Sequence, residues 1–218
     1  MKIGVLGTGV VGKKIGAGLV KVGHEVKIGA RSDTGMEQAK KWVGKNGERA
    51  SAGTFAEAAT FGELVLVAIV WTGCENAIKL AGPENFSGKV VIDVTNPVIY
   101  EEEGKCPRLA LGCTDSAGEH VQRWLPDAKV VKAFNTVGHP HFINPDFPEG
   151  KPDMFICGND SKAKEVVTGI LESLGWPSVI DLGDITGARF MEPLAMLWIR
   201  YMFENNGFYN HAFKLLRK

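Results

Sequence analysis

Three glycines near the start of the chain, Gly7, Gly9 and Gly12, have the spacing GxGxxG. They follow the apolar run Lys2–Leu6 and lead into a segment that we expect to be helical to about Val22. Glycine at these positions permits a tight turn, the approach of a backbone to a pyrophosphate, and close packing of helix on strand. The N–H groups and dipole of the helix start would hold the anion. The pattern therefore predicts a dinucleotide-binding loop.

The residues that follow the second predicted strand indicate which dinucleotide would bind. That strand ends at Gly29–Arg31, where NAD-binding chains place an acidic residue for the ribose hydroxyls. This chain has Arg31 and Ser32 there. A guanidinium can form paired, charge-assisted hydrogen bonds with a 2′-phosphate, which an acid would repel. The charge therefore favours NADP(H) over NAD, with Thr8 as a further contact, although Asp33 could compensate Arg31 or bind a ribose.

Alternating strand and helix patterns must position these residues. Several predicted strands consist almost entirely of Val, Ile and Leu, which is typical of strands covered on both faces. A capping box of Thr54 and Glu57 predicts the start of the helix Phe55–Thr60, and Asp160 predicts another helix start. The alternation predicts an α/β fold with a Rossmann-type, doubly wound, mainly parallel sheet. The predicted strands are Lys2–Leu6, Glu25–Ile28, Leu64–Ile69, Val90–Val94, Val130–Phe134, Met154–Cys157 and Val179–Leu182.

The regular alternation of strand and helix patterns is interrupted by two loop-like regions and ends after Gly187. Residues 96–115 and 139–152 are rich in Pro or Gly and are predicted to be long, functional loops. After Gly187 the sequence is helical and aromatic, and Leu194, Leu197, Trp198 and Tyr201 recur with helical spacing. We therefore predict a dinucleotide-binding Rossmann domain over residues 1–187. Residues 188–218 are predicted to form a short helical C-terminal extension that packs on this domain or on the partner of a homodimer.

Composition argues against several classes of protein. The 25 basic residues balance the 25 acidic ones, whereas a nucleic-acid-binding protein normally has a basic surplus. No apolar run approaches the roughly 20 residues that cross a bilayer, so no membrane association is predicted. The four cysteines show neither CxxC spacing nor the density of a disulfide scaffold. These features predict a cytoplasmic location.

Other residues with chemical potential have simpler interpretations. His139 and His141 lie two residues apart, but no third ligand completes a metal site, so none is predicted. His139 is a candidate proton donor because the pKa of histidine lies near neutrality. Asp93 lies inside an apolar strand and must be hydrogen-bonded, so we expect it to anchor loop backbone or to lie at the strand tip. Asp115 and Ser116 are predicted to cap a helix over residues 117–125.

The glycine loop occurs together with four further motifs: GAR, VIDVTNP at 91–97, VVKAFNTV at 130–137 and EPLAMLWI at 192–199. As a set they resemble the NADP-dependent oxidoreductase family that includes archaeal NADPH:coenzyme F420 oxidoreductases and the cytoplasmic domains of six-transmembrane metalloreductases. The likeness covers nearly the whole chain. It implies NADP(H) as the cofactor and hydride transfer between NADPH and a flavin-type acceptor, with FMN, FAD or coenzyme F420 as the co-substrate.

The resemblance also implies site residues. The residues that would cradle the pyrophosphate are Gly7, Thr8, Gly9, Val10, Val11 and Gly12, and those that would meet the 2′-phosphate are Arg31 and Ser32. The ribose and nicotinamide would be lined by Ala68, Ile69 and Val70, faced by Asn96 and Pro97, and closed by Ala133, Phe134 and Asn135. Ala30 stands where the family often has a serine, which leaves the strength of the NADP preference open.

Hydride transfer to a flavin requires that two rings be held face to face and that water be kept out, with little acid–base chemistry from the protein. This requirement fits a chain with a strong nucleotide motif and no obvious catalytic acid. Trp71 could stack on the acceptor ring or simply shield the crevice. Two other functions stay open: an NADP(H)-binding redox sensor without turnover, and a reductase of a small imine or keto metabolite. The second would require a dimer partner to complete its pocket.

Overall fold

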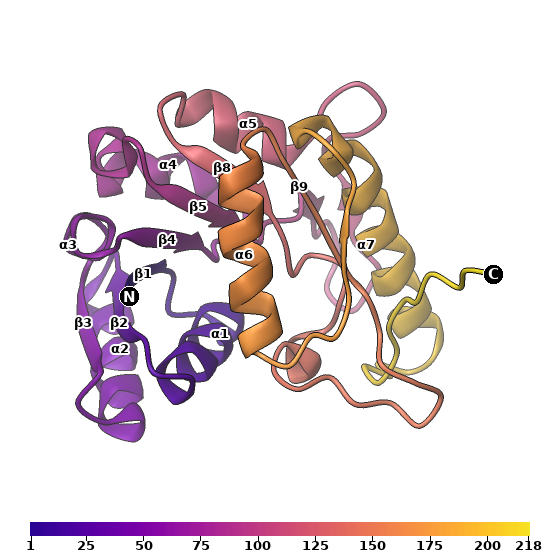
Figure 1. Ribbon diagram of the computed structural model, residues 1–218, viewed down its shortest axis with the longest axis horizontal. Coiled ribbons are helices and arrows are strands. Elements are labelled where there is room, and N and C mark those ends of the chain that lie inside the picture. The colour runs from indigo at the N-terminus through magenta and orange to yellow at the C-terminus, as the bar shows by residue number, and fades with distance from the viewer.

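The computed structural model describes all residues from 1 to 218 (Figure 1). The strands are β1 (Lys2–Leu6), β2 (Glu25–Ala30), β3 (Ala50–Thr54), β4 (Leu64–Val67), β5 (Val90–Asp93), β6 (Val98–Ile99), β7 (Arg108–Leu109), β8 (Lys129–Lys132), β9 (Met154–Gly158) and β10 (Val179–Asp181). The helices are α1 (Val10–Lys21), α2 (Asp33–Asn46), α3 (Phe55–Phe61), α4 (Trp71–Ala81), α5 (Ala117–Trp124), α6 (Ser161–Ser173) and α7 (Ala188–Glu204). Three short 3₁₀ helices are η1 (Pro83–Phe86), η2 (His139–His141) and η3 (Ile185–Gly187).

Eight strands form one sheet in the order β10-β9-β8-β5-β4-β1-β2-β3. All neighbours run parallel except β8 and β9, which are antiparallel. The predicted α/β fold with a mainly parallel, doubly wound sheet is therefore confirmed. The chain first builds outward from β1 to β3 and then returns to the other side of β1 with β4. The strand order thus reverses between β1 and β4, and a ligand crevice is expected at the carboxyl ends of these two strands.

Helices cover both faces of the sheet (Figure 1). One core cluster joins α1, α2 and α6 to the sheet and includes Leu19 and Val5. The other joins α3, α4, α5 and the start of α7 and includes Ile78 and Leu6. Val5 and Leu6 enter different clusters because successive side chains of a strand point to opposite faces. The purely apolar strands are thus explained by burial on both sides.

Capping side chains fix several helix starts. Thr54 accepts a hydrogen bond from the backbone N–H of Glu57 at 3.2 Å, and the Glu57 carboxylate accepts one from Thr54 at 2.7 Å. This confirms the predicted capping box. Asp160 caps α6 through the backbone N–H of Ala163, also as predicted. At α5, Ser116 alone is the cap, so the prediction for Asp115 was wrong. Its carboxylate instead binds the backbone N–H of Ser116 and two side chains of α5.

The observed strands differ from the predicted ones in two respects. The sequence ASAGT of β3 has no apolar run that would predict a strand, yet it pairs with β2 over its whole length at the edge of the sheet. The region 96–115, predicted to be loop, contains the short antiparallel hairpin of β6 and β7. In addition, four predicted strands end earlier than predicted, at Val67, Asp93, Lys132 and Asp181. After Val67 the chain turns toward the crevice, where Ala68, Ile69 and Val70 line the first pocket.

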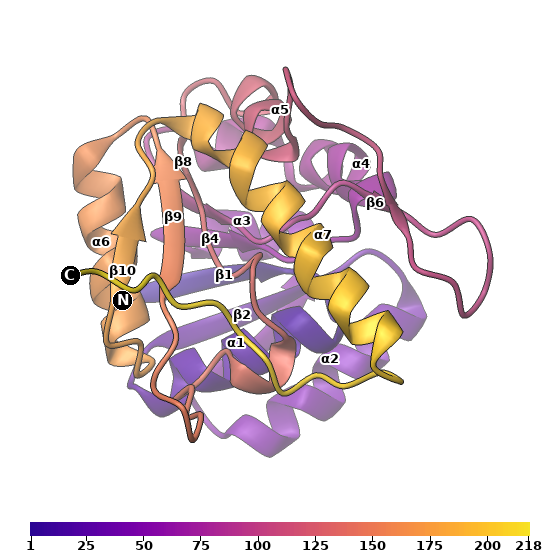
Figure 2. The ribbon, with the colours of Figure 1, turned by 90° about the vertical axis from the view of Figure 1, so that its right-hand side faces the viewer.

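Helix α7 lies across the carboxyl-end side of the sheet (Figure 2). Its buried side includes Met191, Glu192 and Trp198, whereas Phe190 and Leu197 are exposed. Beyond residue 204 the chain has no regular structure and packs back beside α7, where the Trp198 indole donates a hydrogen bond to the His211 carbonyl at 2.8 Å. None of the helices in the molecule combines the length and the apolarity that a bilayer crossing demands.

Candidate functional site

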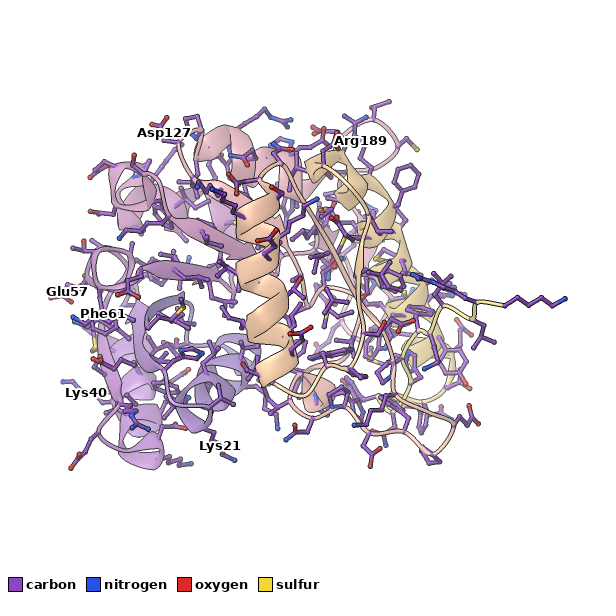
Figure 3. The ribbon with its side chains drawn as sticks, in the orientation of Figure 1. Lys21, Lys40, Glu57, Phe61, Asp127 and Arg189 are labelled. Carbon is purple, nitrogen blue, oxygen red and sulfur yellow. The ribbon has the colours of Figure 1, made fainter.

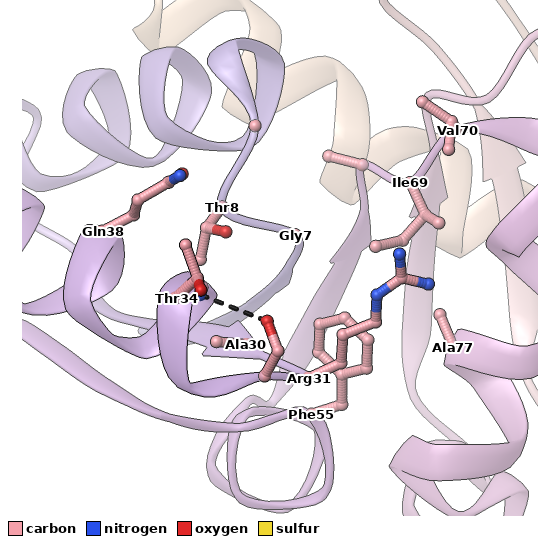
Figure 4. Close-up of a pocket in the computed structure, with 14 residues that line it drawn as sticks. Gly7, Thr8, Ala30, Arg31, Thr34, Gln38, Phe55, Ile69, Val70 and Ala77 are labelled. Carbon is pink, nitrogen blue, oxygen red and sulfur yellow. Dashed lines mark hydrogen bonds between the residues drawn. The ribbon is translucent and has the colours of Figure 1, made fainter.

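The first pocket lies at the carboxyl ends of β1, β2 and β4, where the strand order reverses (Figure 4). It encloses about 310 Å³. One part of its wall is polar and comes from the loop after β1 and the start of α2. Its lining comprises Gly7, Thr8, Gly9, Ala30, Arg31, Ser32, Thr34, Gly35, Gln38, Phe55, Ala68, Ile69, Val70 and Ala77.

The three glycines of the loop after β1 differ in their structural roles. Gly7 has a φ of +113°, and a Cβ there would lie 2.4 Å from the Ala68 carbonyl oxygen. A Cβ on Gly12 would lie 2.2 Å from the Gly7 carbonyl oxygen. Gly9, in contrast, has an ordinary extended backbone, and no atom outside residues 8–10 lies within 4 Å of the position that a Cβ would take. Chain packing therefore demands glycine at 7 and 12, whereas Gly9 leaves open space in front of the loop.

The amino terminus of α1 faces this open space without a side-chain cap. Gly9 is its N-cap residue, and no side chain accepts a hydrogen bond from the first turn. The first turn also contains no acidic residue. Helix α1 therefore presents free backbone N–H groups and the positive end of its dipole to the pocket. This arrangement suits a pyrophosphate.

Arg31 crosses the pocket from the end of β2 toward β4 and α4 (Figure 4). One guanidinium nitrogen comes within 3.5 Å of the position that a Cβ of Gly73 on α4 would take. The side chain is exposed and forms no ion pair, with Asp33 or with any other acid. Ser32 is the N-cap of α2 and accepts from Gly35 N–H at 3.2 Å. A free cation thus lies beside a helix start, which suits a phosphate monoester.

A second pocket continues from the first. It encloses about 520 Å³ and shares four lining residues with the first pocket, Gly9, Ala68, Ile69 and Val70. Ten of its fourteen lining residues are hydrophobic, and none is charged. The ten lining residues that the first pocket does not share are Val10, Val11, Trp71, Thr72, Val94, Thr95, Asn96, Val98, Ile99 and Tyr100. The crevice therefore has a polar compartment for phosphates and an apolar compartment that suits flat rings.

An amide pair fixes Asn96 in the wall of the second pocket. The Asn96 amide nitrogen donates to the Asn135 carbonyl at 3.0 Å, and the Asn135 amide nitrogen donates to Asn96 Oδ1 at 3.1 Å. Asn135 also donates to the Met191 carbonyl of α7 at 3.1 Å. The preceding Phe134 has a φ of +62°, a conformation that is strained for a bulky residue. This turn brings Asn135 back toward Asn96.

A buried charge cluster lies behind this wall. The ammonium group of Lys132, on β8, contacts Asp93 on β5 at 2.8 Å and Glu192 on α7 at 2.9 Å. It also donates to the Thr95 carbonyl at 2.7 Å. The side chains of Lys132 and Asp93 are completely buried, and that of Glu192 is 2% exposed. Glu192 further accepts from the N–H groups of Ala117 and Gly118 at the start of α5.

The cluster holds one loop residue by both of its backbone groups. Asp93 Oδ1 accepts from the Thr95 N–H at 2.9 Å, while Lys132 binds the Thr95 carbonyl. The prediction that Asp93 anchors loop backbone is thus confirmed. Burial alone would lower the pKa of Lys132, but the carboxylates of Asp93 and Glu192 raise it above its ordinary value. The two carboxylates therefore favour the charged form of Lys132.

An aromatic cluster supports the outer wall of the second pocket. The Trp71 indole stacks on Trp124 with ring centroids 5.6 Å apart and meets the edge of His120 at 5.4 Å. His120 is held by Asp115 through a 2.8 Å contact. One face of Trp71 is therefore covered by α5. The indole also belongs to the pocket lining, so it is positioned to meet a ring there.

The residues predicted for the site fall into three groups. Gly7, Thr8, Gly9, Arg31, Ser32, Ala68, Ile69 and Val70 line the first pocket, and Val10, Val11 and Asn96 line the second. Gly12 lies in α1 behind the loop, and Asn135 supports Asn96. Pro97, Ala133 and Phe134 line neither pocket, and the last two lie in the hydrophobic core.

His139 lies outside both pockets. Its ring is 6.0 Å from the ring of Tyr209 in the C-terminal segment. Burial and the nearby Lys14 lower the pKa of His139, which makes the neutral form predominant near pH 7. No group of three or more His, Cys, Asp or Glu side chains in the molecule is arranged to hold a metal ion.

Sequence reasoning missed Thr95, Tyr100, Lys132 and Glu192. A signal for the charge cluster was present, because VVIDV and VVKAF each place one charge inside an apolar strand. Opposite charges at matching positions of two buried strands indicate an ion pair, and the structure pairs Asp93 with Lys132 in register. Glu192 gave no such signal, since glutamate is common in helices.

Comparison with known proteins gives a family match. Residues 2–97 match the family described as NADP oxidoreductase, coenzyme F420-dependent. The chain is 30% identical over 206 residues to the F420-dependent NADP reductase of Methanocaldococcus jannaschii, and the match covers 91% of each protein. It is 27% identical over 198 residues to Metalloreductase STEAP3 of Rattus norvegicus. That match covers 90% of this chain but only 37% of the longer protein.

A solved structure is similar over the full length. It comes from Arthrobacter sp. FB24 and is provisionally named an F420-dependent NADP reductase. It superposes with a TM-score of 0.92 and 39% sequence identity, covering 100% of both chains. The likeness therefore includes α7 and the C-terminal segment as well as the dinucleotide-binding part.

Proposed function

The chain belongs to the NADP oxidoreductase family described as coenzyme F420-dependent, as its sequence motifs predicted, and we propose that it transfers hydride between NADP(H) and a flavin or F420-type deazaflavin. Membership makes it an NADP-dependent oxidoreductase. The observation that carries the proposal is the pair of joined compartments. One is polar with a free arginine, and the other is apolar and uncharged.

The residues of the first pocket fit the phosphates of NADP(H). The open space before Gly9 and the uncapped start of α1 would accept the pyrophosphate. Arg31, which has no acidic partner, would bind the 2′-phosphate together with Thr8 and Ser32. These contacts would direct the nicotinamide past Ile69 into the second pocket, because the two compartments share that part of the wall. The bound cofactor supplies the hydride chemistry.

The protein would contribute position and exclusion of water. The second pocket offers apolar walls from Val10, Ile69 and Ile99 and aromatic surface from Trp71 and Tyr100. Such a surface favours two flat rings in contact, which hydride transfer requires. No carboxylic acid, histidine or lysine lines this pocket. Tyr100 is the one ionisable side chain of this lining, and burial raises its pKa above the ordinary value. A lining so poor in proton donors suits transfer to a flavin-type ring better than reduction of an imine or a ketone, which requires a proton donor beside the substrate.

The experiment that tests this function is anaerobic oxidation of NADPH, followed by its absorbance, with FMN, FAD and coenzyme F420 supplied separately. We expect acceptor-dependent oxidation with at least one of the three. Saturable NADPH binding without turnover would instead favour a redox sensor. Turnover with cyclic imines or small ketones, and none with the flavin-type rings, would establish the metabolite reductase.

A further inference from the structure

Two buried polar atoms beside the second pocket have no hydrogen-bond partner. They are the hydroxyl oxygen of Thr95 and the side-chain oxygen Oδ1 of Asn135. Thr95 is 2% exposed and belongs to the pocket lining. Asn135 is 5% exposed and is bonded to Asn96, which also lines the pocket. Buried polar side chains almost always find a partner, so two unpartnered ones at one place need an explanation.

The surrounding structure fixes the positions of both residues. The backbone of Thr95 is fixed on both sides by the charge cluster, through Asp93 at its N–H and Lys132 at its carbonyl. Only rotation about χ1 can move its hydroxyl. The amide of Asn135 is fixed by two donated hydrogen bonds, to Asn96 and to Met191, which leaves Oδ1 as its free end. The two groups are thus held in place before any ligand binds.

The chemistry of the two atoms points to one kind of ligand group. A hydroxyl can donate a hydrogen bond to a carbonyl, and an amide oxygen can accept one from an N–H. A group that offers a carbonyl and an N–H side by side is an amide. The rest of the pocket is apolar or aromatic, so the amide must belong to a flat, largely apolar ring. Both rings of the proposed reaction qualify, through the nicotinamide carboxamide or the cyclic amide edge of a flavin or deazaflavin.

We propose that Thr95 Oγ1 and Asn135 Oδ1 form the polar recognition site for the amide group of the ring bound in the second pocket. The inference rests on the proposed function for the identity of the rings. Thr95 would be the donor to the carbonyl, and Asn135 would accept from the N–H. Asp93, Lys132 and Glu192 would act as positioning residues, since Asp93 and Lys132 bind Thr95, Glu192 binds Lys132, and none of the three lines the pocket.

The test compares Thr95→Val, which keeps the shape of the side chain and removes the hydroxyl, with Thr95→Ser, which keeps the hydroxyl. Equilibrium binding is measured for NADP⁺ and for 2′-phospho-ADP-ribose, which lacks the nicotinamide. If the carboxamide is the ligand, Thr95→Val weakens NADP⁺ binding by about three- to tenfold and leaves 2′-phospho-ADP-ribose unchanged. Thr95→Ser restores the affinity for NADP⁺.

A third ligand tests Asn135 without disturbing its structural bonds. The 3-acetylpyridine analogue of NADP⁺ keeps the carbonyl but replaces the amide N–H₂ with a methyl group. We expect the unchanged protein to bind this analogue several-fold more weakly than NADP⁺. Thr95→Val should then weaken binding of the analogue by the same factor by which it weakens binding of NADP⁺. If the unchanged protein binds the analogue and NADP⁺ equally well, Asn135 does not recognise the carboxamide of the cofactor.

The acceptor ring is the alternative ligand for this recognition site, and its binding is tested separately. If the amide is that of the acceptor ring, Thr95→Val leaves NADP⁺ binding unchanged and raises the KM for the acceptor by the same factor, again with recovery in Thr95→Ser. The proposal is overturned if Thr95→Val, shown to be folded, changes neither the affinity for NADP⁺ nor the KM. A failure of the proposed function gives a different result from a failure of this proposal. Turnover would then be absent, but the binding of NADP⁺ could still be compared between the variants.

Discussion

Lys132 on β8 and Glu192 on α7, far apart in the sequence, form a 2.9 Å ion pair in the interior of the molecule. The pair joins the C-terminal helix to the wall of the ligand crevice, because Lys132 also binds the carbonyl of Thr95. Glu192 extends the same connection to the start of α5. The last helix of the chain is therefore part of the support of the site and not an appendage to it.

Replacing Lys132 with Met should destabilise the protein strongly. The change leaves Asp93 and Glu192 as buried carboxylates without a counter-ion, which typically costs about 3–5 kcal/mol. Urea denaturation measures the free energy of unfolding. The matched control is Lys129→Met on the same strand, where the partly exposed lysine contacts Asp160 at 3.5 Å and the loss should stay below about 1 kcal/mol. Similar losses in the two variants would contradict the importance of the buried cluster.

Reversing the charge of Arg31 should alter the preference between cofactors. Arg31→Glu removes the proposed contact with the 2′-phosphate and adds repulsion, so NADPH binding should weaken by at least about ten- to a hundredfold. NADH binding should change little, because NADH lacks that phosphate. Fluorescence titration gives both dissociation constants. Lys40→Glu, an equal charge change on α2 that points away from the crevice (Figure 3), controls for long-range electrostatics. Equal losses for both nucleotides would rule out the assignment of Arg31.

Substitution of Gly9 should affect NADPH binding, whereas substitution of Gly12 should affect the stability of the fold. Gly9→Ala adds a methyl group where no atom outside residues 8–10 lies within 4 Å, so the melting temperature should be unchanged while NADPH binding is lost or severely weakened. Gly12→Ala places its methyl group 2.2 Å from the Gly7 carbonyl oxygen, and overpacking of this kind costs about 1–3 kcal/mol. Thermal denaturation and NADPH titration of both variants make the comparison. Normal NADPH affinity in Gly9→Ala would contradict a pyrophosphate at this position.

The attachment of α7 to α5 should weaken in acid. Arg189, at the start of α7 (Figure 3), donates two hydrogen bonds to the Glu119 carboxylate, one of them at 2.9 Å, and these lower the pKa of Glu119 below its ordinary value. A lowered pKa in the folded state means that the contact stabilises the protein fully above the ordinary pKa of 4.5. This stabilisation is lost as the pH falls through the folded value.

The variant Glu119→Gln tests this pH dependence. Its melting temperature should lie a few degrees below that of the unchanged protein at neutral pH, and the difference should shrink as the pH falls below 4.5 and Glu119 becomes protonated. Circular dichroism across this range gives the melting temperatures. Glu165→Gln, on the exposed side of α6 and without an ion pair, should behave like the unchanged protein. A difference between Glu119→Gln and the unchanged protein that is constant with pH would exclude the ionic contact as its cause.

Local patterns were sufficient to predict the fold class, the capping box at Thr54 and the anchoring role of Asp93. Each of these depends on residues close together in the chain or on burial of one strand. The strand β3 was missed because its small and polar residues gain strand structure only by pairing with β2. The hairpin β6–β7 was missed because its pairs are too short to produce a periodic pattern. The homodimer and the division at residue 187 stay predictions.

The candidate site was predictable where a motif encodes it and not where the tertiary structure creates it. Arg31 follows directly from its distance after Gly12. Thr95 becomes notable only because two buried charges fix its backbone, and Glu192 becomes notable only because α7 packs over β8. No spacing rule relates residues that meet through packing of distant elements.

The charge cluster also orders events during synthesis of the chain. Strands β1 to β5 leave the ribosome first, although a domain generally folds as a unit. Lys132 then emerges with Asp93 already available but with Glu192 still to be translated. Until α7 has been made, α5 lacks the carboxylate that binds its first N–H groups, and Thr95 rests on an incomplete ionic network. A chain that stops before α7 therefore contains every residue that lines the two compartments, the last of them Tyr100, but lacks the carboxylate that completes the support of Thr95. The support of the ring compartment is complete only once nearly the whole polypeptide has been made.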